Sequence, residues 1–414
     1  MSSTTLRARY VFPGDGPPIA DGCVTYDADR IVAVGPAPSA ASADDVNVVD
    51  LGSVALLPGL INAHTHLELS SVPAPLGRAR QSLPDWLATV LQQRANGDYD
   101  REAAVQAGLA ESLRYGVTGL ADIVQEAAPR QLRSQTSVAQ LALKELIALA
   151  PELADVRRDE AATFLDAANH ATAAAGLSPH APYTVRPELL QAAVALALPH
   201  GATVAMYLAE SPEEIELLSS GGGPFQQFLA ARGVWRDGIF GHRRPLDELT
   251  RLAEAPRALV IHGNYLDAEE IDCCAAHADR RSVIYCPRTH AYFGHAPHPL
   301  PRLLAQGANV AVGTDSRASN PDLDLLAELR HVAHTVPEIA PHEILALGTS
   351  RAARALGWAK DCGTLAPGKL ANLAVVPLDA RREGAPFELL FDAESRSVAT
   401  IVRGHLAYGA LPVC

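Results

Sequence analysis

LLPGLINAHTHLE, residues 56–68, joins an apolar run to two histidines that are separated by one residue. The apolar part has the length and composition of a strand that is buried on both faces, and His64 and His66 stand at its end. Side chains at positions i and i+2 of a strand face the same side, so both imidazoles can reach one cation. The spacing alone is a weak signal. Together with the buried run before it, it predicts a metal site at a strand end.

Apolar runs alternate with helical stretches from residue 57 onward. The strand-like runs are VTGLADIV (117–124), LALKELIAL (141–149), GLSPHA (176–181), TVAMYLAE (203–210), ALVIHGN (258–264), SVIYCP (282–287) and NVAVGTD (309–315). The stretches between them are rich in Ala, Leu and Arg, which favour helices. This alternation is typical of βα units around a parallel sheet. We therefore predict an α/β protein with a (β/α)₈ TIM barrel over residues 57–362.

Both ends of the chain have a different pattern from the middle. Residues 1–56 and 363–414 contain short β-prone runs separated by turn sequences such as GDGPP and DADR. Each piece alone is too small to bury a core. We therefore predict one small β-sandwich domain built from both termini beside the barrel. The alternative is two unrelated β pieces.

Composition excludes some classes of partner. The 414 residues carry a formal net charge of -13, which argues against nucleic acid, because binding to phosphates needs a basic surface. The sequence contains neither a long uncharged apolar stretch nor a signal-peptide pattern at its start, so we expect no membrane span. The six cysteines are scattered without a C-x-x-C pair, which favours a reducing cytoplasm over a disulfide framework.

Four further polar residues follow predicted strands, namely His180, Glu210, His262 and Asp315. Each one alone is more simply a structural polar residue. In TIM barrels, however, the C-terminal strand ends meet at one rim, and buried carboxylates and imidazoles are costly unless they are paired or metal-bound. Together they predict a hydrolytic metal site. Asp315 would bind the metal and orient a water molecule, His262 would hold that water or polarise the substrate, and Glu210 would shuttle the proton.

The motifs resemble the amidohydrolase superfamily, specifically its cytosine deaminase/chlorohydrolase-like branch. The resemblance runs from about residue 5 to 410 and includes PGLINAHTH (58–66), PHAPYT (179–184), LAES (208–211), GTDS (313–316) and GTLAPGKLANL (363–373). It implies a barrel with a β-sandwich from both termini and a divalent metal. By position, His64, His66 and Asp315 match metal ligands, Glu210 matches the proton shuttle and His262 matches the histidine beside the catalytic water.

Three longer motifs resemble a bacterial subgroup that includes aminodeoxyfutalosine deaminase-like proteins. They are HTHLELS (64–70), CPRTHAYFGH (286–295) and GTDSRASNPDL (313–323). Enzymes of that kind convert an adenine into a hypoxanthine base in a menaquinone precursor. The resemblance therefore suggests a purine-like substrate without identifying it.

Tyr207 departs from the family pattern. The family motif before the shuttle is H-x-x-E, whose histidine is a further metal ligand, and here it reads Tyr207-Leu208-Ala209-Glu210. A neutral phenol is a poor ligand, and tyrosinate is costly unless the metal drives ionisation. Tyrosinate binding, a water in the gap, and a weakened site without activity all stay open.

Further residues are candidates for substrate contacts, each with a structural alternative. His180 matches a family residue that touches substrate, and Glu68 shares the direction of the first strand end but could instead pair with an arginine. Arg288, His290 and Arg317 lie just behind predicted strand ends, where an arginine could hold a substrate carboxylate. Trp86 is expected on a helix over the barrel mouth, either as ordinary packing or as a platform for a purine. Asp122 and Glu145 also sit near strand ends, without a predicted role.

We therefore expect a metal-dependent hydrolase, most simply a deaminase of an aminopurine or its nucleoside. Chlorohydrolase or cyclic-amide hydrolase activity on the same site is the chemical alternative. A catalytically degenerate barrel that binds a small molecule is the alternative that Tyr207 favours. Zinc is the first expectation for the metal, with iron and manganese also suited to nitrogen and oxygen ligands. The oligomeric state stays open, with a homo-oligomer as one expectation from the resemblance.

Overall fold

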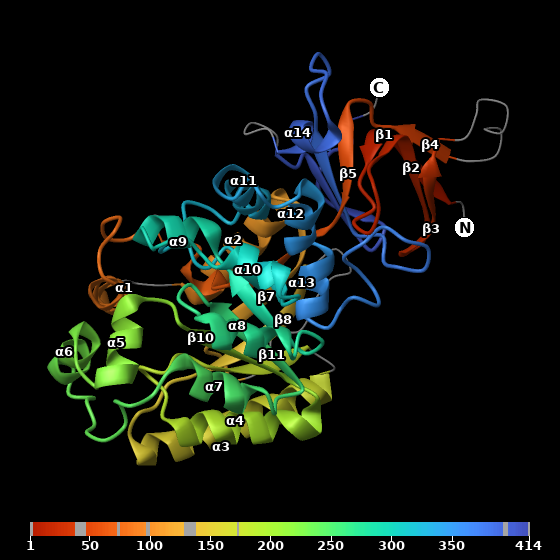
Figure 1. Ribbon diagram of the computed structural model, residues 1–414. Coiled ribbons are helices and arrows are strands. Elements are labelled where there is room, and N and C mark those ends of the chain that lie inside the picture. The colour runs from red at the N-terminus through yellow and green to blue at the C-terminus, as the bar shows by residue number, and fades with distance from the viewer. Residues whose placement is uncertain are drawn as a thin grey trace.

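The computed structural model describes residues 3–37, 47–72, 75–96, 100–127, 138–171, 174–391 and 396–412. Within these ranges the strands form two sheets. One is an eight-stranded parallel sheet surrounded by helices, and the other is built from both ends of the chain and lies beside it (Figure 1).

The parallel sheet is the barrel. Its strands lie side by side in chain order, and each neighbouring pair is parallel. A parallel bridge between Thr65 and Asp315 joins the first strand to the segment after the last one, which closes the ring. The prediction of a (β/α)₈ barrel is therefore confirmed. The strands are β6 (Leu60–Thr65), β7 (Val117–Val124), β8 (Ala139–Leu146), β9 (Ala175–Pro179), β10 (Thr203–Leu208), β11 (Arg257–His262), β12 (Arg281–Tyr285) and β13 (Asn309–Val312).

The barrel strands are apolar on both faces because each face packs against a different core. In β8, Leu141 and Leu143 join the cluster inside the barrel, whereas Ala142 and Leu146 join the cluster beneath the helices. This alternation follows from the two-residue period of a strand. It explains why the strands appear in the sequence as continuous apolar runs rather than as alternating patterns.

Helices α1 (Leu83–Asn96) and α6 (Pro224–Ala231) contact each other and contribute to the inner core cluster, which places them over the barrel mouth. Many of the helices begin with proline, whose fixed φ suits the first helical turn. The remaining helices are the 3₁₀ helix η2 (Leu67–Leu69) and α2 (Arg101–Arg114), α3 (Pro151–Ala171), α4 (Pro187–His200), α5 (Pro212–Ser220), α7 (Pro245–Leu252), α8 (Ala268–Ala275), α9 (Pro287–Phe293), α10 (Leu300–Ala305), α11 (Leu325–Thr335), α12 (Pro341–Leu347), α13 (Ser350–Ala355) and α14 (Pro386–Leu390).

The second sheet joins the two ends of the chain, as predicted. Its order is β16-β15-β14-β5-β1-β2-β3, with β4 paired to β1, and the two ends meet where β5 pairs antiparallel with β14. Its own core includes Leu6, Leu56 and Leu373. The strands are β1 (Thr4–Val11), β2 (Ile19–Asp27), β3 (Arg30–Pro36), β4 (Asn47–Asp50), β5 (Val54–Pro58), β14 (Leu373–Pro377), β15 (Ala399–Val402) and β16 (His405–Gly409). The predicted domain boundary after residue 56 falls within β5, and the boundaries at 56 and 362 stay predictions.

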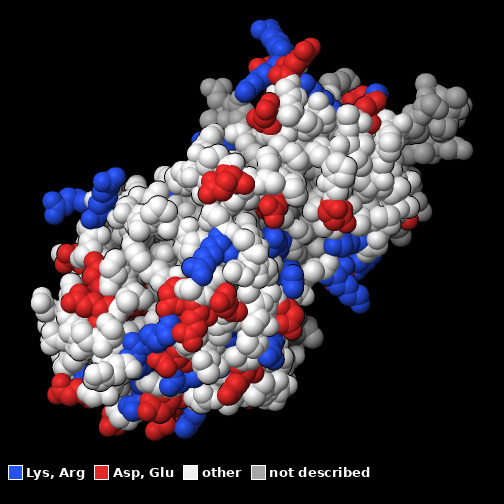
Figure 2. Space-filling view, in the orientation of Figure 1, with Lys and Arg blue, Asp and Glu red and all other residues white. Residues whose placement is uncertain are grey.

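The surface carries charges of both signs. On the face shown in Figure 2, Lys and Arg side chains are interspersed with Asp and Glu, most densely over the helices at the lower end of the molecule. No helix of the described residues is long and apolar enough to cross a membrane.

Gly313 is the residue that allows the barrel to close tightly, and this can be tested. A Cβ at this position would lie 2.8 Å from both the Cβ and the carbonyl oxygen of His64. We expect Gly313→Ala to lower the free energy of unfolding by about 1–3 kcal/mol, because backbone must move to relieve the clash. Thermal unfolding of this variant is compared with that of Gly35→Ala, since a Cβ at Gly35 meets nothing within 4 Å. Equal midpoints for the two variants would contradict this account of closure.

Candidate functional site

Three predicted ligands meet at the closure of the barrel. His64 and His66 come from the end of β6, and Asp315 comes from the segment after β13. The Nε2 atoms of both histidines lie 3.4 Å from Asp315 Oδ1. One ligand atom from each of the three residues lies within 4.8 Å of the others, so the group has the size of a metal site.

The backbone is left-handed at two of the strand ends that carry the site. Asp315 has a φ of 55° and His262 a φ of 69°, values that residues other than glycine rarely adopt. Such conformations persist where the surroundings impose them, and they cluster at functional sites. Here they turn the side chain away from the strand direction and into the barrel mouth.

His64 supplies the observation that fits a cation. Its side chain is fully buried, and neither ring nitrogen has a hydrogen-bond partner within the described part of the chain. Buried polar groups in folded proteins are normally satisfied, because leaving one unpaired costs about 1–3 kcal/mol. Burial also keeps the pKa of His66 well below its usual value, so that imidazole is neutral and has a lone pair to offer. The three residues therefore fit a divalent cation.

Glu210 lies beside this cluster and is paired with His262. The distance from His262 Nε2 to Glu210 Oε1 is 3.3 Å, and the Tyr183 hydroxyl donates to Glu210 Oε2 over 3.4 Å. Burial, followed by the nearby Asp315 carboxylate, raises the pKa of Glu210 well above its usual range. Burial lowers the pKa of His262 to about 3, so its ring is neutral. The pair therefore has a carboxyl group that readily holds a proton next to a neutral imidazole.

A second carboxylate fixes the backbone that carries Glu210. The two oxygens of Glu214 accept hydrogen bonds from the backbone N–H groups of Ala209 and Glu210, each over 2.9 Å. The Asn264 side chain donates to the carbonyl oxygen of Glu210. These contacts hold the loop after β10 in one conformation, which explains how Ala209 keeps a φ of 52°.

Tyr207 contacts a predicted ligand. Its hydroxyl lies 2.6 Å from His66 Nε2, and since that imidazole is neutral, the phenol donates the hydrogen bond. Burial, followed by Asp315 and Glu145, raises the pKa of Tyr207 well above its usual value, so the phenol is neutral. Tyr207 is therefore in contact with a predicted ligand, and its hydroxyl occupies the nitrogen that His66 would offer to a metal.

A cavity of about 230 Å³ opens above this cluster. His66, Tyr207, Glu210 and Asp315 are at the end where the cluster lies. The rest of the lining is mainly apolar and comes largely from α1 and α6: Leu83, Trp86, Leu87, Val90, Leu91, Phe228 and Leu229. The site is thus a metal-sized cluster and a proton carrier at one end of an apolar cavity.

Comparison with known proteins assigns this arrangement to a family. A model of the amidohydrolase family matches residues 55–406. The chain belongs to the amidohydrolase family. This amidohydrolase is therefore a metal-dependent hydrolase that acts on carbon–nitrogen bonds, as the sequence predicts.

Individual relatives match this chain over nearly its whole length. The sequence is 29% identical to 5-methylthioadenosine/S-adenosylhomocysteine deaminase from Moorella thermoacetica, over 97% of this chain and 93% of the relative. An adenosine deaminase from Xanthomonas campestris with bound zinc is 23% identical, with a TM-score of 0.80 over 100% of this chain and 94% of that one. Aminofutalosine deaminase from Helicobacter pylori, in complex with methylthio-coformycin, is 21% identical, with a TM-score of 0.82 over 97% and 99%. These two structures show that the fold is shared.

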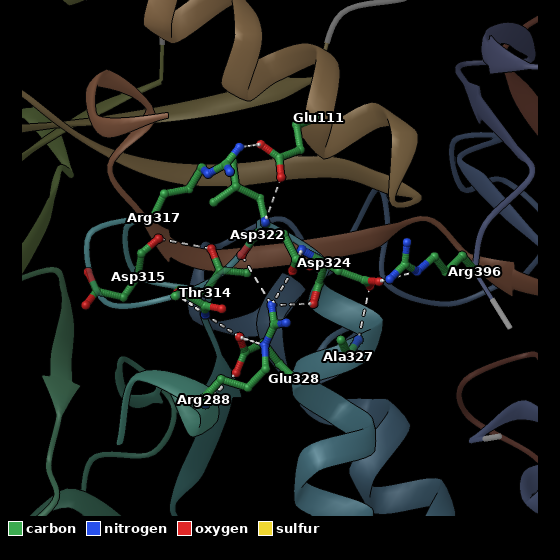
Figure 3. Close-up of polar contacts among 12 residues, drawn as sticks. Glu111, Arg288, Thr314, Asp315, Arg317, Asp322, Asp324, Ala327, Glu328 and Arg396 are labelled. Carbon is green, nitrogen blue, oxygen red and sulfur yellow. Dashed lines mark hydrogen bonds and ion pairs between the residues drawn. The ribbon is translucent and has the colours of Figure 1, made fainter. Parts of the chain in front are cut away.

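Behind the cluster, the amidohydrolase has a buried polar network that supports Asp315. Ser319 Oγ donates to Asp315 Oδ2 over 2.9 Å, which leaves Oδ1 facing the two histidines. Asn320 donates to the carbonyl oxygen of Thr314 and to Glu328, and Glu328 in turn accepts from Arg288 over 2.7 Å. Figure 3 shows Arg288 and Glu328 of this network beside Thr314 and Asp315. The network fixes which oxygen of Asp315 faces the site.

Three of the predicted substrate contacts belong to such packing networks. Arg288 binds Glu328 and Asp322, and Arg317 binds Glu111 over 3.1 Å (Figure 3). His290 is buried, with its Nε2 donating to the carbonyl oxygen of Ala296. Of the described residues that line the cavity, none is Arg288, His290 or Arg317. A substrate-binding role for these three therefore gains no support.

The other predicted contacts lie at the cavity or next to it. His180 and Trp86 line it, and the Nδ1 atom of His180 is hydrogen-bonded to Thr184 Oγ1. Glu68 is buried and paired with Arg94 over 2.5 Å, and it is Arg94 that lines the cavity. For Glu68 the alternative of pairing with an arginine thus matches the structure, whereas His180 and Trp86 remain candidates for substrate contact.

Sequence reasoning missed Tyr183, Arg94 and Ser319. Tyr183 lies three residues after His180 in the PHAPYT motif, so its position could have been noticed. Arg94 is in the last turn of α1, and no local pattern marks it as a cavity residue. Ser319 gains its role only because the loop after β13 folds back on Asp315.

Replacing Tyr207 tests its effect on the metal. We expect Tyr207→His to bind zinc more tightly than the wild type, because an imidazole is a better ligand than a neutral phenol. Tyr207→Phe has neither a ligand atom nor a donor to His66, so it separates these two effects. Affinities are measured by competition with a zinc chelator. If the histidine variant shows no gain, Tyr207 does not lie in the metal's coordination sphere.

Ser319→Ala tests the network behind Asp315. Without the hydroxyl, the Asp315 carboxylate can rotate, and we expect zinc affinity to fall about 10- to 100-fold, as is usual when an outer contact of a ligand is removed. The matched control is Ser219→Ala, at an exposed serine in α5. Equal zinc affinity in the Ser319 variant, the control and the wild type would show that Ser319 does not contribute to metal binding.

Proposed function

We propose that this amidohydrolase is a metal-dependent deaminase that removes the amino group of an aminopurine nucleoside by hydrolysis. The observation that carries the proposal is the pairing of Glu210 with His262 directly beside the cluster of His64, His66 and Asp315. A site that only bound a ligand would not need a proton carrier at this position. The relative from Moorella thermoacetica, whose name refers to adenosine-type substrates, supports the choice of substrate class.

His64, His66 and Asp315 would hold the cation, with Tyr207 beside them. A divalent cation with an open position lowers the pKa of a water molecule to about 7, which supplies a nucleophile at neutral pH. Zinc is our first expectation, because two imidazoles and a carboxylate suit it and the adenosine deaminase from Xanthomonas campestris contains it. Iron and manganese also accept these ligand types.

Glu210 would move the proton during the reaction. Attack by water forms a C–O bond at the ring carbon, and Glu210 takes up a proton from that water. The carboxyl group then gives the proton to the ring amino group as the C–N bond breaks and ammonia leaves. His262 is neutral and lies 3.3 Å from Glu210 Oε1, so it can hold the attacking water without competing for the proton.

The cavity suits a flat heterocycle. Its walls are mainly apolar, and Trp86 packs edge-to-face on Phe293 with ring centroids 5.3 Å apart, which holds the indole in place. The indole N–H of Trp86 is buried without an acceptor among the described residues, so a ligand can supply one. Apolar walls with a few directed polar groups are typical of sites for small molecules.

Tyr207 favours a second candidate, a barrel that binds a small molecule without turnover. Its hydroxyl occupies His66 Nε2, which weakens the case for a filled metal site. We place this candidate second, because Glu210, His262 and Asp315 keep the arrangement that hydrolysis needs.

We also propose a cytoplasmic location, since the five described cysteines are free thiols. A homo-oligomer stays a prediction.

Ammonia release tests the function. The zinc-loaded protein is assayed with a panel of aminopurines, their nucleosides and chlorinated heterocycles. We expect ammonia from nucleosides, with kcat about 10²–10⁴-fold lower in Glu210→Gln at unchanged metal content, because the proton carrier is lost. Glu216→Gln, at an exposed residue of α5, is the control. Chloride release would favour the chlorohydrolase alternative, and binding of nucleosides without any product would favour the degenerate barrel.

A further inference from the structure

Glu145 is a cavity carboxylate that the metal cluster does not use. It is the second-last residue of β8 and follows Leu141 and Leu143, which face the inside of the barrel. The two-residue period of a strand therefore directs Glu145 into the barrel mouth, where it lines the same cavity as Glu210 and Asp315. Of the described residues that line the cavity, it is the one acidic residue outside the metal cluster and the proton carrier.

The carboxylate of Glu145 is only partly satisfied. Its Oε2 accepts a hydrogen bond from Gln125 Nε2 over 3.1 Å, which fixes its orientation. Within the described ranges no Lys or Arg forms an ion pair with Glu145. Arg94, which lines the same cavity, is paired with Glu68. An ionised carboxylate at an apolar wall is costly without donors, so a ligand that supplies O–H groups would be favoured there.

Glu145 lines the same cavity as Tyr207 and His180. Its charge contributes to raising the pKa of Tyr207, second only to Asp315 among the neighbouring charges, after the larger effect of burial. Burial lowers the pKa of His180, and the charge of Glu145 partly offsets that effect. The charge of Glu145 therefore acts on two side chains that line the same cavity. The sugar of a nucleoside whose purine lies at the metal cluster would occupy the rest of this cavity, which Glu145 also lines.

The choice of ligand group follows from charge. A carboxylate can bind an ammonium group or a pair of hydroxyls. The guanidinium groups of Arg94 and Arg232 line the same cavity, and Arg232 is held over the Phe228 ring at 4.4 Å. Two nearby cations disfavour an ammonium group but do not disfavour neutral hydroxyls.

We propose that Glu145 is a specificity-determining residue that binds the vicinal hydroxyls of the sugar in a purine ribonucleoside. This inference rests on the proposed function for its substrate class. A vicinal diol offers two adjacent O–H donors to one carboxylate, and both the free base and a 2′,3′-dideoxy sugar lack this pair. Glu145 thus selects ribonucleosides over free aminopurines, whereas the cluster at the other end performs the reaction.

The test removes the carboxylate and the hydroxyls separately. Dissociation constants for adenosine and 2′,3′-dideoxyadenosine are measured by calorimetry with the wild type and Glu145→Ala, and ammonia release is followed with the same pair. We expect adenosine to bind the variant about 10- to 100-fold more weakly than the wild type, as for loss of hydrogen bonds to a charged group, with dideoxyadenosine nearly unaffected. KM should change and kcat should not. Glu152→Ala, at an exposed carboxylate in α3, is the matched control.

The outcomes separate this inference from the proposed function. Equal losses for both nucleosides, or no loss for either, would overturn the role of Glu145, even if the wild type deaminates adenosine. Wild-type protein that binds adenosine but releases no ammonia would overturn the proposed function, and the dissociation constants would still decide the role of Glu145. Tighter binding of adenine than of adenosine by the wild type would also overturn the role of Glu145.

Discussion

The site depends on the contact that closes the barrel. The segment after β13 returns to β6, where the backbone N–H of Asp315 donates to the carbonyl oxygen of His64 and the Thr65 hydroxyl donates to the carbonyl oxygen of Asp315. Gly313 lies so close to His64 that a larger residue would separate the strands. The hydrogen bonds that close the ring are therefore the same ones that bring Asp315 to the two histidines, although about 250 residues of chain separate them.

This closure concentrates ionisable groups in a buried space, and other contacts offset the cost. Glu214 is fully buried, with a pKa raised by burial to about 8, and it is satisfied by two backbone N–H groups. Glu328 is balanced by Arg288 and Asn320. By contrast, neither ring nitrogen of His64 has a hydrogen-bond partner in the described structure, and its Nε2 lies 3.4 Å from Asp315 Oδ1. The carboxylates of Glu214 and Glu328 thus have hydrogen-bond partners within the protein, whereas the His64 ring nitrogens remain available to a cation.

The cavity above the cluster is formed by elements that are distant in the sequence. Helices α1 and α6 cover the mouth and supply most of its apolar wall, while β8 supplies Glu145 and the loop after β9 supplies His180. In the proposed function, the strand ends provide the groups that carry out the reaction. The covering helices and Glu145 provide surfaces that can distinguish one substrate from another. In the proposed function, the groups that select the substrate therefore line the same cavity as the groups that carry out the reaction.

Local sequence patterns were sufficient to predict the barrel, the joining of both termini and the residues of the cluster. These follow from local patterns: apolar strands of fixed period, and polar residues at strand ends that a parallel barrel must bring to one rim. Which nearby residues contact the site depends instead on tertiary contacts. Arg288 and Arg317 are in the right region, but their acidic partners Glu328 and Glu111 lie 40 and 206 positions away, and no local pattern reveals such pairing. The contact of Tyr207 with His66 and that of Glu145 with Gln125 were equally hidden, because side-chain partners depend on distances across the barrel, which strand periodicity does not specify.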